Sequence, residues 1–193
     1  MKHRVEFLYE VCVKKYSFMY MQLFGIAGIV VALDQWTKWL VRENIPFGAQ
    51  WLPEGLAWLL PYARIVHWHN TGAAFGMFQN GGAVFTVLAF IVIGVILFYY
   101  PKIESEGWLF RLALSLQLAG ALGNLIDRLT QDWKVTDFIS VGTFPVFNVA
   151  DSAISVGTVV LILGVWLSER AEKQARAESE AKGNGEQTVL SEE

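Results

Sequence analysis

Two aspartates, Asp137 and Asp151, carry the chemistry that this sequence most clearly offers, because each lies beside a long apolar segment. Asp137 follows Val135 and Thr136, and Asp151 follows Asn148. Carboxylates near membrane-spanning segments are costly to bury and commonly mark a functional site. Two carboxyl groups held close together share one proton, so that one acts as a base and the other as an acid. The pair would then activate water for hydrolysis, as in aspartic peptidases.

Each aspartate also has a purely structural interpretation. Asp151 comes near the start of an expected helix, where the helix dipole favours a negative charge, and Asn148 could cap that helix. Asp137 could be a turn residue in the loop between two apolar segments. For Asp151, the functional interpretation is favoured by a polar stripe along one helix face, formed by Asn148, Asp151, Ser152 and Ser155.

Four long apolar segments would have to position these carboxyl groups. The chain has 193 residues, of which 54% are hydrophobic, and a mean hydropathy of +0.38. A helix needs about 20 mostly apolar residues to cross the hydrocarbon core of a bilayer. The sequence therefore predicts a mainly α membrane protein with four transmembrane helices, at about 18–40, 82–100, 108–126 and 149–167. Residues 1–168 are expected to form a single membrane peptidase domain, followed by a polar cytoplasmic tail at 169–193. This tail is rich in Glu, Ala and Lys and could be a helical extension that frays.

Cysteine, histidine and basic residues limit the other kinds of site. The single cysteine, Cys12, cannot form an internal disulfide bond, and no Cys/His spacing typical of zinc is present. His67 and His69 would share one face of a strand, but the sequence offers no evident third ligand, so no metal is expected. No basic patch is interleaved with aromatic residues, so nucleic acid is not an expected partner.

Lysine and arginine predict the orientation, because cytoplasmic loops carry an excess of both. With four spans, the two chain ends and the loop between the second and third spans lie on the same side. That side holds Lys2, Arg4, Lys14, Lys15, Lys102, Arg111, Arg170, Lys173, Arg176 and Lys182. The other side holds Arg42, Arg64, Arg128 and Lys134, with Lys38 near the end of a span. Both termini are therefore expected in the cytoplasm, and 41–81 and 127–148 are expected outside.

The outer segment 44–80 is more than a simple turn. Residues 64–70 alternate loosely, as a short strand does, and predict a small extracytoplasmic β-cradle on the membrane surface. Such a sheet could hold an extended substrate by adding it as a strand. The following run, 70–76, contains small residues such as Gly72 that permit close backbone approach. We interpret it as a substrate-contact loop in which Asn70 offers both a donor and an acceptor.

The third apolar segment carries one polar helix face, formed by Gly120, Gly123, Asn124, Asp127 and Arg128. Glycine permits close helix approach, and asparagine can hydrogen-bond across the contact. The structural interpretation is a packing face with an interfacial ion pair between Asp127 and Arg128. The functional interpretation is the polar floor of a site.

Asp34 and Lys38 lie four residues apart in the first span, so they share a helix face and can form an ion pair. We interpret this pair as structural, because it could lock the first helix to the outer segment. Polar residues inside four helices could also line a transport path, or belong to a non-catalytic scaffold. Transport would predict polar residues through the whole depth of the membrane, whereas here they gather at the outer end.

Five short sequence motifs occur in a fixed order along the chain, and together they are specific for one protein family. They are Asp34-Gln35-Trp36-Thr37-Lys38, Asn70-Thr71-Gly72-Ala73-Ala74-Phe75, Gly120-Ala121-Leu122-Gly123-Asn124-Leu125-Ile126-Asp127-Arg128, Thr136-Asp137-Phe138 and Phe147-Asn148-Val149-Ala150-Asp151-Ser152. With these motifs the chain resembles the bacterial lipoprotein signal peptidases, also called signal peptidase II, over about residues 20–168.

The resemblance implies a fold, an activity and a site. Members of this family have four transmembrane helices and a periplasmic β-cradle, and they lie in the bacterial cytoplasmic (inner) membrane with the active site at its outer face. They remove signal peptides from lipid-modified prolipoproteins, cutting before the lipidated cysteine, without a cofactor, and are inhibited by globomycin. The expected partners are therefore prolipoproteins, the lipid bilayer and globomycin-type inhibitors. The catalytic dyad matches Asp137 and Asp151. The supporting residues match Asn70, Asn124, Arg128 and Asn148, and the residues that brace the cradle match Asp34 and Lys38.

The chain departs from the family pattern directly before the first catalytic aspartate. Thr136 stands where an aliphatic residue is common, and the loop 130–135 is slightly long for the family. Neither departure touches the two carboxyl groups. Both could change how the loop seats Asp137.

Overall fold

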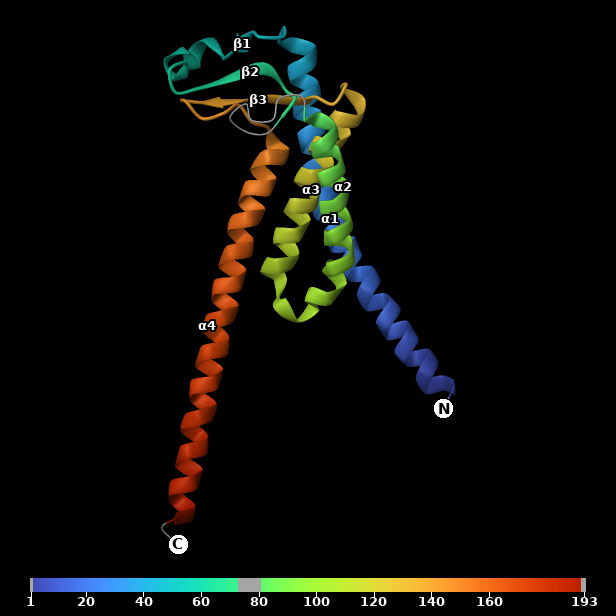
Figure 1. Ribbon diagram of the computed structural model, residues 1–193, viewed down its shortest axis with the longest axis vertical. Coiled ribbons are helices and arrows are strands. Elements are labelled where there is room, and N and C mark those ends of the chain that lie inside the picture. The colour runs from blue at the N-terminus through green and yellow to red at the C-terminus, as the bar shows by residue number, and fades with distance from the viewer. Residues whose placement is uncertain (1, 73–80, 192–193) are drawn as a thin grey trace.

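The computed structural model describes residues 2–72 and 81–191 and has four helices with a small sheet at one end (Figure 1). The helices are α1 (Lys2–Asn44), α2 (Gly82–Tyr99), α3 (Trp108–Thr130) and α4 (Val149–Ser191). Each contains a stretch that is long and apolar enough to cross a membrane, which confirms the four expected spans. Of the expected substrate-contact loop, the part beyond Gly72 lies outside the described residues.

Three of the helices extend further than hydropathy predicts. α1 continues to Asn44 and α3 to Thr130, whereas the expected spans end at about 40 and 126. α4 runs on without interruption through the polar segment as far as Ser191. Ala, Glu, Lys and Arg are frequent there, and all are good helix formers although they do not favour the bilayer. The expected polar tail is therefore largely a helical extension of α4.

The sheet has three antiparallel strands in the order β1-β2-β3, namely β1 (Gln50–Trp51), β2 (Ala63–Asn70) and β3 (Val135–Val141). Two short 3-10 helices, η1 (Glu54–Leu59) and η3 (Tyr100–Glu106), lie between the larger elements. β2 confirms the strand predicted at 64–70.

β3 corrects one expectation from the sequence. Asp137 does not lie in a loop between two spans but pairs with Trp68 of β2. The partner strand comes from far away in the sequence, and local alternation around Asp137 does not reveal this pairing. The strand holds the backbone of Asp137 more firmly than a turn would.

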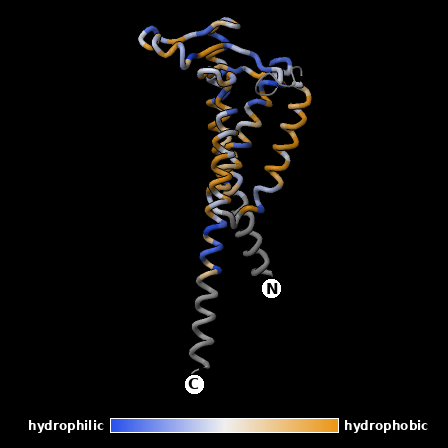
Figure 2. The backbone as a smooth tube through the Cα atoms, turned by 60° about the vertical axis from the view of Figure 1, so that its left-hand side comes forward, coloured by the Kyte–Doolittle hydropathy of each residue, from blue (hydrophilic) through white to orange (hydrophobic). Residues whose placement is uncertain are grey.

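α3 packs against the other three helices. Half of its most apolar stretch is buried, a larger share than in any of the other three. The main core joins Met19, Leu23 and Ala27 of α1 to Leu118 and Ala119 of α3. Apolar residues also cover the outer surface of the helices, while polar residues gather at the sheet and on the extension of α4 (Figure 2). A helix that is apolar on every side is typical of a membrane span.

The contact between α3 and α4 depends on a glycine. A β-carbon at Gly120 would lie 2.5 Å from the backbone oxygen of Ala150 and would also collide with Ile154. Since backbone cannot yield as a flexible side chain does, Gly120→Ala is expected to lower the free energy of unfolding by about 1–3 kcal/mol. Gly94→Ala in α2 is the matched control, because a β-carbon there meets nothing within 4 Å. Thermal unfolding in detergent would compare the two, and equal melting temperatures would contradict the prediction.

Candidate active site

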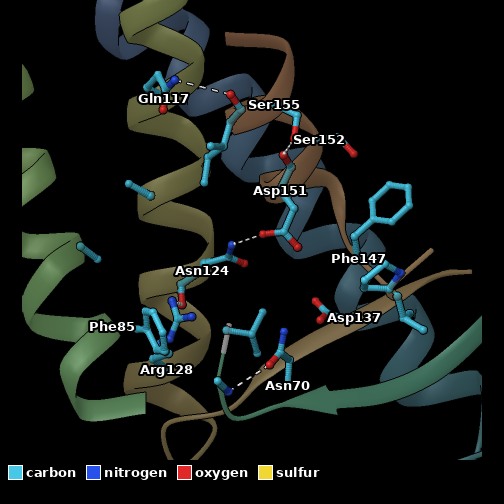
Figure 3. Close-up of a pocket in the computed structure, with 18 of the residues that line it drawn as sticks. Asn70, Phe85, Gln117, Asn124, Arg128, Asp137, Phe147, Asp151, Ser152 and Ser155 are labelled. Atoms are coloured by element: carbon cyan, nitrogen blue, oxygen red, sulfur yellow. Dashed lines mark hydrogen bonds between the residues drawn. The ribbon is translucent and has the colours of Figure 1, made fainter. Parts of the chain in front are cut away.

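A cavity of about 750 Å³ is bordered by α2, α3, α4 and the sheet, and both predicted catalytic carboxyl groups lie on its wall (Figure 3). Asp137 comes from β3, and Asp151 comes from the first turn of α4. The other predicted site residues on the wall are Asn70, Gly72, Asn124 and Arg128. Apolar side chains such as Leu88 and Val92 of α2 form much of the remainder. The cavity therefore joins a polar end to an apolar, membrane-embedded region.

Asn148 places Asp151 through a reciprocal cap at the start of α4. The Asn148 side-chain oxygen accepts from the Asp151 backbone N–H at 2.9 Å, and the Asn148 backbone N–H donates to the Asp151 carboxylate at 3.2 Å. This is the geometry of a capping box. The helix-cap prediction is confirmed, and the same contact fixes the Asp151 carboxyl group where it borders the cavity.

Two asparagines, Asn124 on the cavity wall and Asn148 behind it, join the two carboxyl groups. The Asn148 side-chain N–H donates to Asp137 at 2.7 Å and to the Asn124 side-chain oxygen at 3.1 Å. The Asn124 side-chain N–H in turn donates to Asp151 at 2.7 Å. Asn148 is fully buried and Asn124 nearly so, which strengthens these hydrogen bonds. Asp137 and Asp151 are thus members of one hydrogen-bonded unit.

The surroundings of Asp137 favour its protonated form. Burial and, next, the nearby charge of Asp151 raise the pKa of Asp137 to about 7. Hydrogen bonds from Asn70 and Asn148 and the charge of Lys38 oppose this rise. A carboxyl group that keeps its proton near neutral pH can act as an acid beside an ionised partner.

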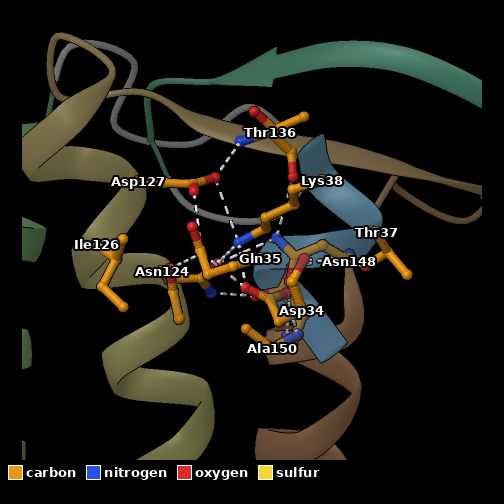
Figure 4. A network of polar contacts seen from close by, with 12 residues as sticks. Asp34, Gln35, Thr37, Lys38, Asn124, Ile126, Asp127, Thr136, Asn148 and Ala150 are labelled. Atoms are coloured by element: carbon orange, nitrogen blue, oxygen red, sulfur yellow. Dashed lines mark hydrogen bonds and ion pairs between the residues drawn. The ribbon is translucent and has the colours of Figure 1, made fainter. Parts of the chain in front are cut away.

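A buried cluster of charges lies directly behind these asparagines (Figure 4). The Lys38 ammonium lies 2.9 Å from Asp34 and 3.3 Å from Asp127, and all three side chains have almost no exposed surface. The predicted ion pair between Asp34 and Lys38 is therefore confirmed. Lys38 also donates to the Asn124 side-chain oxygen at 3.1 Å. Because this oxygen faces the ammonium, the amide N–H groups of Asn124 face away from it, and one of them donates to Asp151.

The same cluster fastens three elements together. Asp34 accepts from the backbone N–H of Ala150 in α4 at 2.8 Å, and Asp127 accepts from the backbone N–H of Thr136 in β3 at 2.9 Å. Gln35 donates to Asp34, to the Gly123 backbone oxygen and to Asp127 at 3.0–3.2 Å. The resemblance implied that Asp34 and Lys38 brace the cradle; in the structure their cluster reaches it through Asp127.

Arg128 faces the cavity rather than this cluster. Its guanidinium carbon lies 5.5 Å from the centre of the Phe85 ring, and its charge is attracted by Asp151 and Asp137. Asp127, by contrast, lies beside Lys38 and, at 3.7 Å, Arg42. The two neighbours in sequence therefore differ in their closest partners, although the charge of Asp127 also attracts Arg128.

β2 contributes Asn70 to the polar end, and the segment directly after β2 contributes Gly72. The Asn70 side-chain oxygen accepts from the Gly72 backbone N–H at 2.9 Å, and the Asn70 side chain also hydrogen-bonds Asp137. Nearby, the His67 and His69 rings pack at 5.1 Å, and His67 contacts the Ile45 backbone oxygen at 2.7 Å. Within residues 2–72 and 81–191, no group of three or more His, Cys, Asp or Glu side chains is arranged to hold a metal.

Some residues of the site have no clear signal in the sequence. Gln35 belongs to one of the five motifs but had no predicted role, although its bonds join α1 to α3. From the sequence, Arg42 contributed only to the predicted orientation. It lies four residues after Lys38 on the same helix face, and in the structure it is near Asp127. Phe85 and Gln117 line the cavity from apolar or weakly polar surroundings that suggest only membrane packing.

Comparisons with known proteins identify the family of this chain. The family model for signal peptidase (SPase) II matches residues 26–167. A lipoprotein signal peptidase of Shouchella clausii is 40% identical over 153 residues, covering 78% of this chain and 96% of that protein. One from Acinetobacter baylyi is 36% identical over 162 residues, covering 80% and 86%. A bacterial membrane enzyme structure obtained by the in meso method at 2.3 Å resolution has a TM-score of 0.67 at 28% identity, covering 76% and 88%. With a family match across most of its length and a four-span fold that agrees with it, the chain is a member of the signal peptidase II family of membrane peptidases.

Proposed function

We propose that the protein is an intramembrane aspartyl endopeptidase that removes signal peptides from diacylglyceryl-modified prolipoproteins, cutting before the lipidated cysteine. One observation carries the proposal: Asn148 and Asn124 hold Asp137 and Asp151 together at the polar end of a membrane cavity. The substrate class follows from the relatives, which are lipoprotein signal peptidases.

The proposed reaction divides the work between the two aspartates. One ionised carboxylate takes a proton from water, and the water oxygen bonds to the carbonyl carbon of the scissile peptide. The other carboxyl group, still protonated, donates to the carbonyl oxygen as negative charge develops there. The C–N bond then breaks as the amide nitrogen receives a proton from the dyad. The pair titrates jointly, so the proton belongs to both carboxyl groups.

Arg128 and Asn70 are suited to bind the substrate around this centre. Both line the cavity beside the dyad, and both present N–H donors there. Donors fixed before the reaction stabilise a developing oxyanion without reorganising. We assign them to binding the substrate backbone and the oxyanion, and Gly72 to close approach of the substrate chain.

The cavity and the charges also support a location. Apolar walls from α2 and α4 suit a substrate whose signal segment and lipid chains arrive from the bilayer, while the polar end admits water. The basic residues favour a cytoplasmic location for both termini, so the dyad would lie at the outer face of the bacterial cytoplasmic membrane. In this proposal residues 1–168 form the single catalytic domain, and a globomycin-type inhibitor would compete for the cavity.

Cleavage by the purified protein in detergent or lipid tests the proposal. A diacylglyceryl-modified prolipoprotein is expected to yield a product that begins with the modified cysteine, as mass spectrometry would show. The same precursor without its lipid is the matched control and is expected to remain intact. A folded wild-type protein that leaves both precursors uncut would refute the proposal, and cleavage at another bond would refute the assigned site.

The raised pKa of Asp137 predicts a pH dependence of cleavage and of stability. Asp137 loses its proton as pH rises through about 7, which leaves the dyad without its acid. Above this pH, kcat/KM is expected to fall about tenfold per pH unit. Stability is expected to change in the same direction, because a raised folded-state pKa stabilises the fold below the ordinary value of 3.8 and loses this effect as pH rises through about 7.

Melting temperatures of wild type and Asp137→Asn between pH 4 and 9 provide a check that needs no substrate. The wild-type melting temperature should decline across this range more steeply than that of Asp137→Asn, which has no carboxyl proton to lose. Parallel curves would show that Asp137 ionises as an ordinary aspartate.

A further inference from the structure

Thr136, the residue directly before Asp137, is fully buried. Its polar atoms hydrogen-bond to residues of α1, of α3 and of the cap of α4. Its backbone N–H donates to Asp127 of α3 at 2.9 Å, and its backbone oxygen accepts from Asn148 before α4 at 3.4 Å. Its side-chain oxygen accepts from Arg42 of α1 at 3.1 Å. Each polar atom of this residue therefore has a partner from a different part of the site.

These contacts matter because β3 is an edge strand. Among the described residues it pairs only with β2 within the sheet, where Thr136 lies opposite His69 and Asp137 opposite Trp68. An edge strand presents one row of backbone groups that no neighbouring strand fixes. At Thr136 side chains take the place of that strand, so the path of the backbone into Asp137 is set by them.

The hydroxyl contact is the one that depends on residue type. Arg42 lies in the last turn of α1, is 22% exposed, and lies 3.7 Å from Asp127. A guanidinium donor makes a stronger bond to an oxygen than a neutral donor does. An aliphatic residue at position 136 could keep both backbone bonds but could not accept from Arg42.

We propose that the Arg42–Thr136 hydrogen bond is a positioning contact for peptide cleavage: it ties β3 to the end of α1 and so holds the Asp137 carboxyl group in register with Asp151. Arg42 and Thr136 are positioning residues that act through Asp137. This inference rests on the proposed function, in which Asp137 is catalytic. It adds a link from α1 to the dyad that runs through the strand rather than through the asparagines.

Thr136→Val tests the contact with little change in shape. Valine keeps the branched side chain and both backbone bonds, and Arg42 keeps Asp127 as a neighbour. We expect kcat to fall about fivefold to twentyfold with KM changed less than twofold, since the contact aligns the reacting group rather than the substrate. Thr136→Ser restores the oxygen and is expected to recover most of kcat. Thr130→Val is the matched control, because that exposed hydroxyl bonds within its own helix and should be dispensable.

Two further readouts separate positioning from general destabilisation. Hydrogen exchange of peptides spanning 135–141 should be faster in Thr136→Val than in wild type or Thr136→Ser, while α2 stays unchanged. In a cycle with Arg42→Met, the double variant should lose no more kcat than Arg42→Met alone, because Arg42→Met already breaks the bond that Thr136→Val removes. Wild-type kcat in Thr136→Val, failure of serine to restore it, unchanged exchange, or additive losses would each overturn the inference.

The same assay distinguishes failure of the positioning contact from failure of the proposed function. Wild type and Asp137→Asn are included in the same assay as reference points. If wild type cleaves, Asp137→Asn does not, and Thr136→Val matches wild type, the positioning contact is wrong and the proposed function stands. If wild type does not cleave or Asp137→Asn remains active, the proposed function fails and this inference fails with it.

Discussion

Replacing either Asp137 or Asp151 with asparagine is expected to reduce cleavage of a lipid-modified prolipoprotein by at least about 10³-fold. Asparagine cannot take a proton from water or give one to the substrate, and removing positioned acid–base groups typically costs 10²–10⁴-fold each. The amide oxygen of asparagine can still accept from Asn148 or Asn124, so the fold should survive. Melting temperatures close to wild type would show that lost activity is lost chemistry.

The double variant and a matched control sharpen this result. Groups that act as one unit are not additive, so Asp137→Asn/Asp151→Asn should be about as inactive as either single variant. Asp132→Asn makes the same chemical change at an exposed residue before β3, where the backbone has a positive φ of 51° that asparagine tolerates. It should cleave like wild type. Activity within tenfold of wild type in either single dyad variant would remove that residue from the catalytic assignment.

The sequence predicted those features that depend on local pattern. Hydropathy over a window as long as the bilayer is thick revealed the four spans, because each span must bury its own backbone in lipid. Helical spacing grouped Gly123, Asn124 and Asp127 on one face, and in the structure this face meets Asp34 and Ala150. The asparagine cap of α4 was also predicted, since a cap involves residues only three positions apart.

Features that depend on long-range contacts could not be predicted in the same way. β3 forms because Val135–Val141 pairs with β2, and α2 and α3 separate these two strands in the sequence. Gln35 and Arg42 hydrogen-bond to residues of α3 and β3. The residues next to them in the sequence do not indicate these partners. The extension of α4 belongs to the local features, because the frequent Glu, Ala and Lys residues after Ser168 already suited a helical continuation.

The second large effect is expected from Lys38, because its charge balances two buried carboxylates. Lys38→Met would leave Asp34 without a cation and Asp127 with only the more distant Arg42, at 3.7 Å, although both carboxylates have almost no exposed surface. Breaking a buried ion pair by removing one partner costs about 3–5 kcal/mol. Methionine fills much of the same space, so the loss would report charge rather than a cavity. Thermal unfolding of the purified protein should show a melting temperature many degrees below wild type.

Neutralising the whole cluster separates charge balance from packing. Asp34→Asn/Lys38→Met/Asp127→Asn leaves no unpaired buried charge, and replacing an entire buried cluster is much less costly than breaking it. The triple variant should therefore be more stable than Lys38→Met alone, although it carries more substitutions. Lys173→Met on the exposed extension of α4 is the control for loss of one positive charge and should melt like wild type. A triple variant less stable than Lys38→Met would show that the specific hydrogen bonds, rather than the balance of charge, hold α1 to α3 and α4.

Recovered stability should not bring recovered cleavage. In the triple variant the Asn124 amide oxygen has lost one of its two donors, the ammonium, and keeps only Asn148, so the amide is held less firmly with its N–H toward Asp151. An Asn124 amide that turns presents its oxygen to Asp151 instead of an N–H. Two oxygens facing each other would push Asp151 away from the geometry that it shares with Asp137. We therefore expect a folded triple variant whose kcat remains at least about tenfold below wild type, in line with the cost of misplacing a catalytic group. Wild-type kcat in this variant would limit the role of Lys38 to stability.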